Sequence, residues 1–121
     1  MPHKGKDSQL TDRERVEHML LAASDALMFV KGRTRVELNT DSMLRRALVN
    51  CVQEIGEAAA KVTDEGRAQV PHIPWPKMVG MRHILVHVYH DLDLDAIWNV
   101  ATQNLGDLVA QLQAALKNWP A

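Results

Sequence analysis

Three side chains in the second half of the chain, Arg82, His87 and Tyr89, have types and spacing suited to phosphodiester chemistry. Histidine is the side chain that most readily takes or gives a proton near neutral pH. An arginine guanidinium can stabilise the negative charge that builds up on a phosphate under attack. Taken singly, the three residues could equally be a surface ion-pair partner, a capping or interface histidine and a half-buried tyrosine. Taken together, they favour metal-free cleavage of a phosphodiester.

The segment that carries these residues is predicted to be a helix from Pro76 or Lys77 through Tyr89. On such a helix Arg82 and Tyr89 share one flank, whereas His87 lies roughly 140° around from Arg82. One straight helix therefore cannot bring both groups to one substrate atom. Either the helix bends before His87, or two copies of it meet across a symmetric dimer, which is the arrangement that we favour.

Three further helices are predicted to hold this segment in place. The first begins at the capping box Thr11–Glu14 and ends at Lys31-Gly32, and the second is capped by Thr40 or Asp41 and ends at 64–66. Residues 70–76 contain three prolines and form an extended connection in which Trp75 reaches the core. The last helix follows a turn at 91–95 and runs to about Leu116. With no alternating strand pattern, the expected class is all-α, a four- to five-helix up-down bundle.

Composition limits the remaining choices. The chain has 121 residues, 46% hydrophobic residues and a formal net charge of −1, which is typical of one globular domain without a general attraction to nucleic acid. We expect a disordered tail over 1–10 and a single domain over 11–119. The single cysteine, Cys51, is expected to be a buried thiol, and no stretch approaches the length of a membrane span. A cytoplasmic protein that does not engage membranes fits these features.

The pattern of Arg82, four residues, His87, one residue and Tyr89 resembles the motif of the HEPN superfamily. Flanking segments also resemble its HepT-like (DUF86) members, in the same order along the chain: 54–59 on the second helix, 70–75 in the connection, 80–82 before the motif and 93–98 after it. The resemblance covers roughly residues 12 to 116. It identifies the chain as a HepT-like toxin of a HEPN/MNT toxin–antitoxin pair of the type VII kind.

This resemblance implies an activity, partners and roles for the three residues. The activity would be metal-independent endoribonuclease cleavage of RNA, with no cofactor, by Arg82 and His87 in a cleft between the subunits of a homodimer. Tyr89 would receive AMP from a cognate minimal nucleotidyltransferase antitoxin, with which a larger assembly can form. Added bulk and negative charge near Arg82 would then keep RNA out of the cleft.

Three other residues are expected to support the site. His83 stands where the family usually has asparagine, and it could orient a phosphate or act as a second acid or base. Glu54 and Glu57 lie on the second helix, and a solvated or helix-pairing face is as good an account of them as a role beside the site. The loop between the first two helices lacks the family's usual phenylalanine, which we interpret as a packing change.

Two other functions stay open from the sequence. In the predicted helix, His83, His87 and His90 fall along one face with Asp91 nearby, which could bind zinc or another divalent ion. The chain could also be a non-catalytic helical module that binds a nucleotide or a protein. The arginines at 33, 35, 45 and 46 could help to hold RNA, although a solvated charged face is the simpler account.

Overall fold

The fold was analysed in a computed structural model, which describes residues 10–83, 86–88 and 91–119. Residues 1–9, most of the predicted tail, lie outside the described residues. The elements, in chain order, are α1 (Asp12–Val30), α2 (Glu37–Thr40), α3 (Ser42–Lys61), α4 (Asp64–Gln69), α5 (Trp75–Gly80), the 3-10 helix η2 (Met81–His83), β1 (Val86–Val88), β2 (Asp91–Leu92), α6 (Leu94–Asn99), the π-helix η3 (Val100–Asn104) and α7 (Leu105–Lys117).

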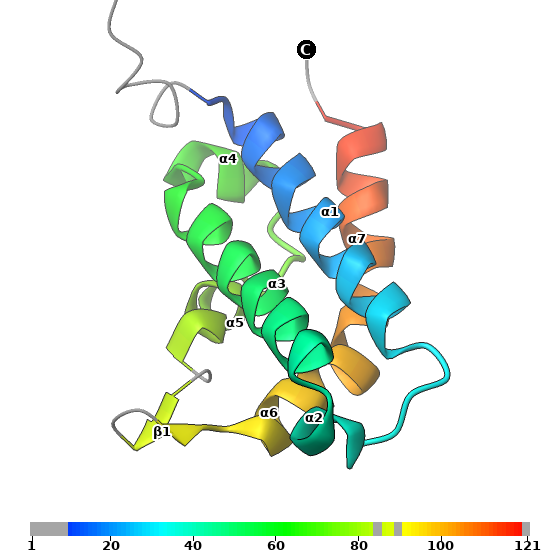
Figure 1. The fold of residues 1–121 in the computed structure, drawn as a ribbon. Helices are drawn as coiled ribbons and strands as arrows, with labels where there is room; N and C mark the ends of the chain where they lie inside the picture. The colour runs from blue at the N-terminus through cyan, green and yellow to red at the C-terminus, as the bar shows by residue number, and fades with distance from the viewer. Residues whose placement is uncertain (1–9, 84–85, 89–90, 120–121) are drawn as a thin grey trace, which may run out of the picture.

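Three long helices form the body of the fold. Helix α1 lies between α3 and α7, contacts both and runs antiparallel to both (Figure 1). The predicted helical up-down bundle is therefore confirmed. The most completely buried side chains come from the three long helices, from α2 and α6 and from the connection before α5: Val16, Met19, Leu38, Leu48, Val52, Ile55, Ile73, Ile97, Leu105 and Leu112. Within the described ranges, none of the helices is both long and apolar enough to cross a membrane.

Side-chain caps begin α1 and α3 where the sequence predicts them. The Thr11 hydroxyl accepts a hydrogen bond from the backbone N–H of Glu14, whose carboxylate accepts one from the backbone N–H of Thr11. Asp41 caps α3 by accepting a hydrogen bond from the backbone N–H of Leu44. At the end of α1, Gly32 has a φ of 74°, the left-handed conformation that favours glycine after a helix.

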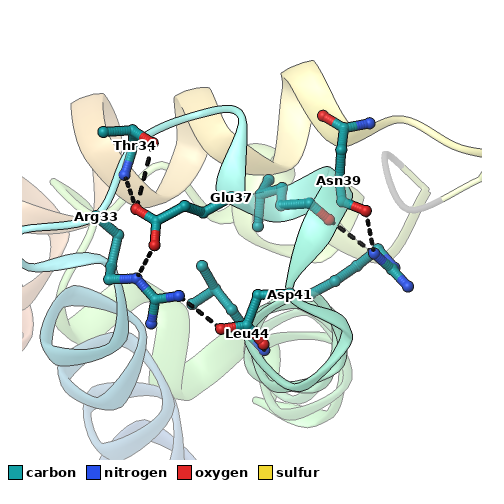
Figure 2. Close-up of polar contacts among 8 residues, drawn as sticks. Arg33, Thr34, Glu37, Asn39, Asp41 and Leu44 are labelled. Atoms are coloured by element: carbon teal, nitrogen blue, oxygen red, sulfur yellow. Dashed lines mark hydrogen bonds and ion pairs between the residues drawn. The ribbon is translucent and has the colours of Figure 1, made fainter.

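Arg33 contributes two ion pairs to the connection from α1 to α3. Arg33 Nε lies 2.8 Å from a carboxylate oxygen of Glu37, and its Nη2 lies 2.6 Å from one of Asp41. Figure 2 shows this arginine between the two carboxylates, with the backbone N–H of Thr34 also donating to Glu37. The arrangement fixes the short helix α2, which the sequence analysis did not predict, against the start of α3.

Three helix boundaries differ from the prediction. Helix α3 ends at Lys61, because Thr63 caps the new helix α4 and also donates to the Asp12 carboxylate of α1 through its backbone N–H. The predicted last helix is divided, since the π-helix η3 lies between α6 and α7. The connection predicted to be extended forms a turn, in which the backbone N–H of Ile73 donates to the carbonyl of Val70, and it ends at Pro74. Trp75 begins α5 and is buried as predicted, with its indole N–H donating to the same carbonyl.

The largest error concerns the motif segment. The helix predicted through Tyr89 ends at Gly80, one 3-10 turn follows, and β1 then pairs antiparallel with β2, with Val86 opposite Leu92 and Val88 opposite Asp91. The sequence analysis predicted no strand. The two β-branched valines favour extended backbone, and here tertiary context prevails over the helical spacing. The hairpin stands at the edge of the helical body, beside α5 and α6 (Figure 1).

Candidate active site

Arg82 lies on the 3-10 turn η2, which is held by the buried side chain of Met81 and by a close contact with Gly56 of α3. Met81 is buried in the core, while Arg82 and His83 are exposed. The turn presses against α3 at Gly56, where an added Cβ would lie 2.9 Å from the Arg82 backbone nitrogen and 3.2 Å from its Cβ and Cγ. A glycine is required here because any side chain would collide with the turn. The backbone of Arg82 therefore packs directly against α3.

The head groups of Arg82 and His83 are available for a ligand. In the part of the chain that the structure describes, neither side chain has a hydrogen-bond or ion-pair partner. An arginine without an internal carboxylate partner can bind a phosphate without first giving up an ion pair. The catalytic role of Arg82 and the supporting role of His83 stay predictions.

His87 lies in the middle residue position of β1, so its backbone is part of the hairpin. The helical arithmetic that set it roughly 140° from Arg82 no longer applies, because a strand has two residues per repeat and a longer rise than a helix. The dimer inferred from that arithmetic loses this support. Tyr89 and His90 lie outside the described residues.

The rival metal site loses its geometric basis as well. His83, His87 and His90 were expected on one face of a helix, but a 3-10 turn and a strand replace that helix. Within residues 10–83, 86–88 and 91–119, no three His, Cys, Asp or Glu residues are grouped so that they could hold a metal ion.

Glu54 and Glu57 face a different part of the molecule from Arg82. Both line a pocket of about 590 Å³ between α1 and α3, together with Arg15 and His18. At 100° per residue, Glu54 lies roughly 160° around α3 from Gly56, and Glu57 roughly 100°. Glu57 accepts a 3.4 Å hydrogen bond from the Gln53 amide. Within one subunit, the structure therefore does not bring Glu54 to Arg82.

Gly56 is the residue of this site that the sequence analysis missed. It lies between the two predicted glutamates in a segment that carries the family resemblance, yet it received no role. A glycine in the middle of a helix costs about 1 kcal/mol relative to alanine, which is a signal that some close approach requires it. The partner in that approach, the turn at Arg82, follows only from the tertiary structure.

Comparisons with known proteins agree on one family. The family model described as Ribonuclease HepT-like matches residues 19–115. The chain is 30% identical over 107 residues to "Putative RNase TTE0752" of Caldanaerobacter subterraneus subsp. tengcongensis, covering 88% of this chain and 96% of that protein. It is 28% identical over 95 residues to "Putative RNase MJ1380" of Methanocaldococcus jannaschii, covering 78% and 87%.

A third relative carries the family name itself. The "Probable ribonuclease HepT" of Thermococcus cleftensis is 26% identical over 77 residues, which cover 64% of this chain and 70% of that protein. No solved structure matches the chain. Because the family model spans most of the helical body and the turn that presents Arg82, the chain belongs to the Ribonuclease HepT-like family.

Proposed function

We propose that the chain is a metal-independent endoribonuclease toxin in which Arg82 and His87 cleave RNA. The observation that carries the proposal is the exposed, unpartnered guanidinium of Arg82 among the described residues, on a turn wedged against Gly56, in a chain of a ribonuclease family. A fixed cation at this position can stabilise charge that develops on a phosphate in the transition state.

The chemistry requires a nucleophile, a base, an acid and a countercharge. Without a metal to activate water, the nucleophile is the 2′-hydroxyl of the RNA, whose proton passes to the His87 imidazole as its oxygen forms a bond to phosphorus. Arg82 stabilises the resulting five-coordinate dianion. The bond to the 5′-oxygen then breaks, and that oxygen takes a proton from a protonated imidazole, supplied by the partner subunit's His87. The products are a 2′,3′-cyclic phosphate and a 5′-hydroxyl.

Cleavage of matched RNA and DNA strands in EDTA tests this chemistry. The unmodified protein is expected to cut the RNA strand, leaving 5′-hydroxyl ends, and to leave the DNA strand intact. Cleavage that requires an added divalent ion, or that leaves 5′-phosphate ends, would contradict the mechanism. Binding of RNA without cleavage would instead favour the non-catalytic binding module.

The working unit in this proposal is a homodimer with two motifs in one cleft. Two imidazoles are needed if one takes a proton while the other gives one, and a symmetric dimer supplies both. The described surface also carries large apolar side chains that a second copy could cover, since Leu21, Met28, Val36 and Met43 are more than 60% exposed.

Two measurements test the dimer. Light scattering is expected to give twice the mass of the chain. Mixing the wild type with an excess of His87→Ala is expected to lower the activity of the wild-type subunits, because a mixed dimer keeps only one of the two imidazoles that the step needs. A monomeric mass in an active preparation would contradict a shared cleft.

Regulation by an antitoxin is the last part of the proposal. A minimal nucleotidyltransferase would join the Tyr89 phenol oxygen to the α-phosphate of ATP and release pyrophosphate. The attached AMP brings bulk and negative charge close to Arg82 in sequence and blocks the approach of RNA. Intact-mass analysis after incubation with the antitoxin and ATP is expected to show an added AMP on the wild type but not on Tyr89→Phe. Equal modification of both would remove Tyr89 from this role.

A further inference from the structure

Most basic side chains around α2 and the start of α3 are already used within the fold. Arg33 binds Glu37 and Asp41, as Figure 2 shows, and Arg35 pairs with Asp95 at 2.8 Å. Arg45 donates from Nη1 to the carbonyl oxygens of Leu38, at 2.8 Å, and of Asn39, at 3.4 Å. These three arginines support the fold and are poorly placed to leave it for a ligand.

Arg46 differs from these neighbours. It is exposed, and among the residues that the structure describes it has no hydrogen-bond or ion-pair partner. It lines a pocket of about 320 Å³ whose other walls are Arg45, Val49, Asn50, Gln53 and Leu92. The pocket therefore combines an available cation, two amide side chains and two apolar side chains.

This pocket lies on the side of α3 that carries the Arg82 turn. Counting 100° per residue from Gly56, Val49 lies roughly 20° away, Gln53 roughly 60° and Arg46 roughly 80°. Asn50 lies farther around, at roughly 120°, and also lines the pocket toward α1, whose glutamates lie at roughly 100° and 160°. Leu92, in β2, closes the pocket from the hairpin that also holds the backbone of His87. The α3 face and the hairpin thus continue from Arg82 toward Arg46.

The distance along this face suits a strand of RNA. Ten residues separate Arg46 from Gly56, which is roughly 15 Å along the helix axis. At about 3.4 Å per nucleotide in a stacked strand, that distance is covered by about four nucleotides. Two unpaired arginines separated in this way can bind two phosphates of one strand while the amide and apolar side chains between them meet bases or sugars.

We propose that the surface formed by Arg46, Val49, Asn50, Gln53 and Leu92 binds the single-stranded RNA on one side of the phosphate held by Arg82. Arg46 contacts a backbone phosphate about four nucleotides away and takes no part in the chemical step. This inference rests on the proposed function, because it assigns a substrate path that leads to the proposed site.

The test is binding of a 12-nucleotide single strand with 2′-O-methyl sugars, which lacks the nucleophilic hydroxyl. Arg46→Gln is compared with Arg13→Gln, which removes the same charge from a residue that contacts Glu17 and the carbonyl oxygen of Leu116 at the opposite end of the bundle. We expect Arg46→Gln to weaken binding roughly five- to tenfold at 50 mM salt, as one phosphate contact is lost. The slope of log affinity against log salt should flatten by about 0.7, and Arg13→Gln should leave both unchanged.

Cleavage kinetics separate this inference from the proposed function. With a cleavable strand, Arg46→Gln is expected to raise KM and leave kcat within about twofold of the wild type, while Arg46→Lys restores most of the affinity. If the wild type cleaves RNA and Arg46→Gln has the same KM and the same salt slope, this surface does not bind the RNA, while the proposed function stands. If the wild type binds RNA through Arg46 but does not cleave it, the proposed function is contradicted and RNA binding by this surface is supported.

Discussion

Gly56→Ala perturbs the candidate site at its support and removes none of the proposed catalytic side chains. The new methyl group would lie 2.9 Å from the backbone nitrogen of Arg82 and 3.2 Å from its Cβ and Cγ. Because a backbone atom is the nearest neighbour, rotation of a flexible side chain cannot relieve the contact. The turn that carries Arg82 must move away from α3.

The size of the effect follows from these distances. Ordinary contact begins at 3.4 Å, so the turn must shift by about 0.5 Å. Alanine gains about 1 kcal/mol of helix propensity over glycine, while overpacking a tight site costs about 1–3 kcal/mol. The free energy of unfolding should therefore fall by no more than about 2 kcal/mol. A catalytic group displaced by 1 Å can lose about a hundredfold in rate, so we expect roughly a tenfold loss of kcat.

The assay is RNA cleavage in EDTA together with urea unfolding, and Gly106→Ala is the matched control. Gly106 lies in α7, and an added Cβ there meets nothing within 4 Å. This control should keep its activity and gain up to about 1 kcal/mol of stability. If Gly56→Ala keeps full activity and is as stable as Gly106→Ala, α3 does not position Arg82 through this contact.

Two further predictions concern the body of the fold. Burial raises the pKa of the Cys51 thiol to about 11. A maleimide at pH 8 should therefore label the native protein far more slowly than the urea-unfolded chain, and equal rates would contradict the burial of Cys51. The hydrogen bond from the Arg33 side chain lowers the pKa of Asp41. The pKa of Glu37 is lowered mainly by the hydrogen bond from the Thr34 backbone N–H and next by the one from Arg33. These interactions stabilise the folded state fully above the unfolded carboxyl pKa of about 4, and the stabilisation is lost as pH falls through the lower folded pKa values. The urea midpoint should therefore drop in acid, and it should drop less in Arg33→Ala.

Local signals were sufficient to predict the starts of α1 and α3 and much of the core. The capping groups of Thr11 and Asp41 act within three residues along the chain, so the sequence contains the whole interaction. Cys51 lies within an apolar pattern and Trp75 in the proline-rich connection; the burial of both was predicted, and both are buried in the structure.

The errors arise where distant parts of the chain decide the outcome. The hairpin at β1 and β2 replaces a helix because extended pairing and contacts beyond the segment outweigh a helical spacing of apolar residues. The contact of Gly56 with the Arg82 turn joins residues 26 positions apart in the sequence, and no local pattern predicts it. The π-helix that divides the last helix also had no sequence signal that we could identify.

The central claim is that Arg82 and His87 carry out RNA cleavage. The most direct test is the single-turnover rate of cleavage of one defined RNA in EDTA by the wild type, Arg82→Ala and His87→Ala, after circular dichroism has established equal helicity. We predict that the wild type cleaves and that each variant is slower by at least about a hundredfold. A folded variant that cleaves as fast as the wild type would contradict the assignment of that residue.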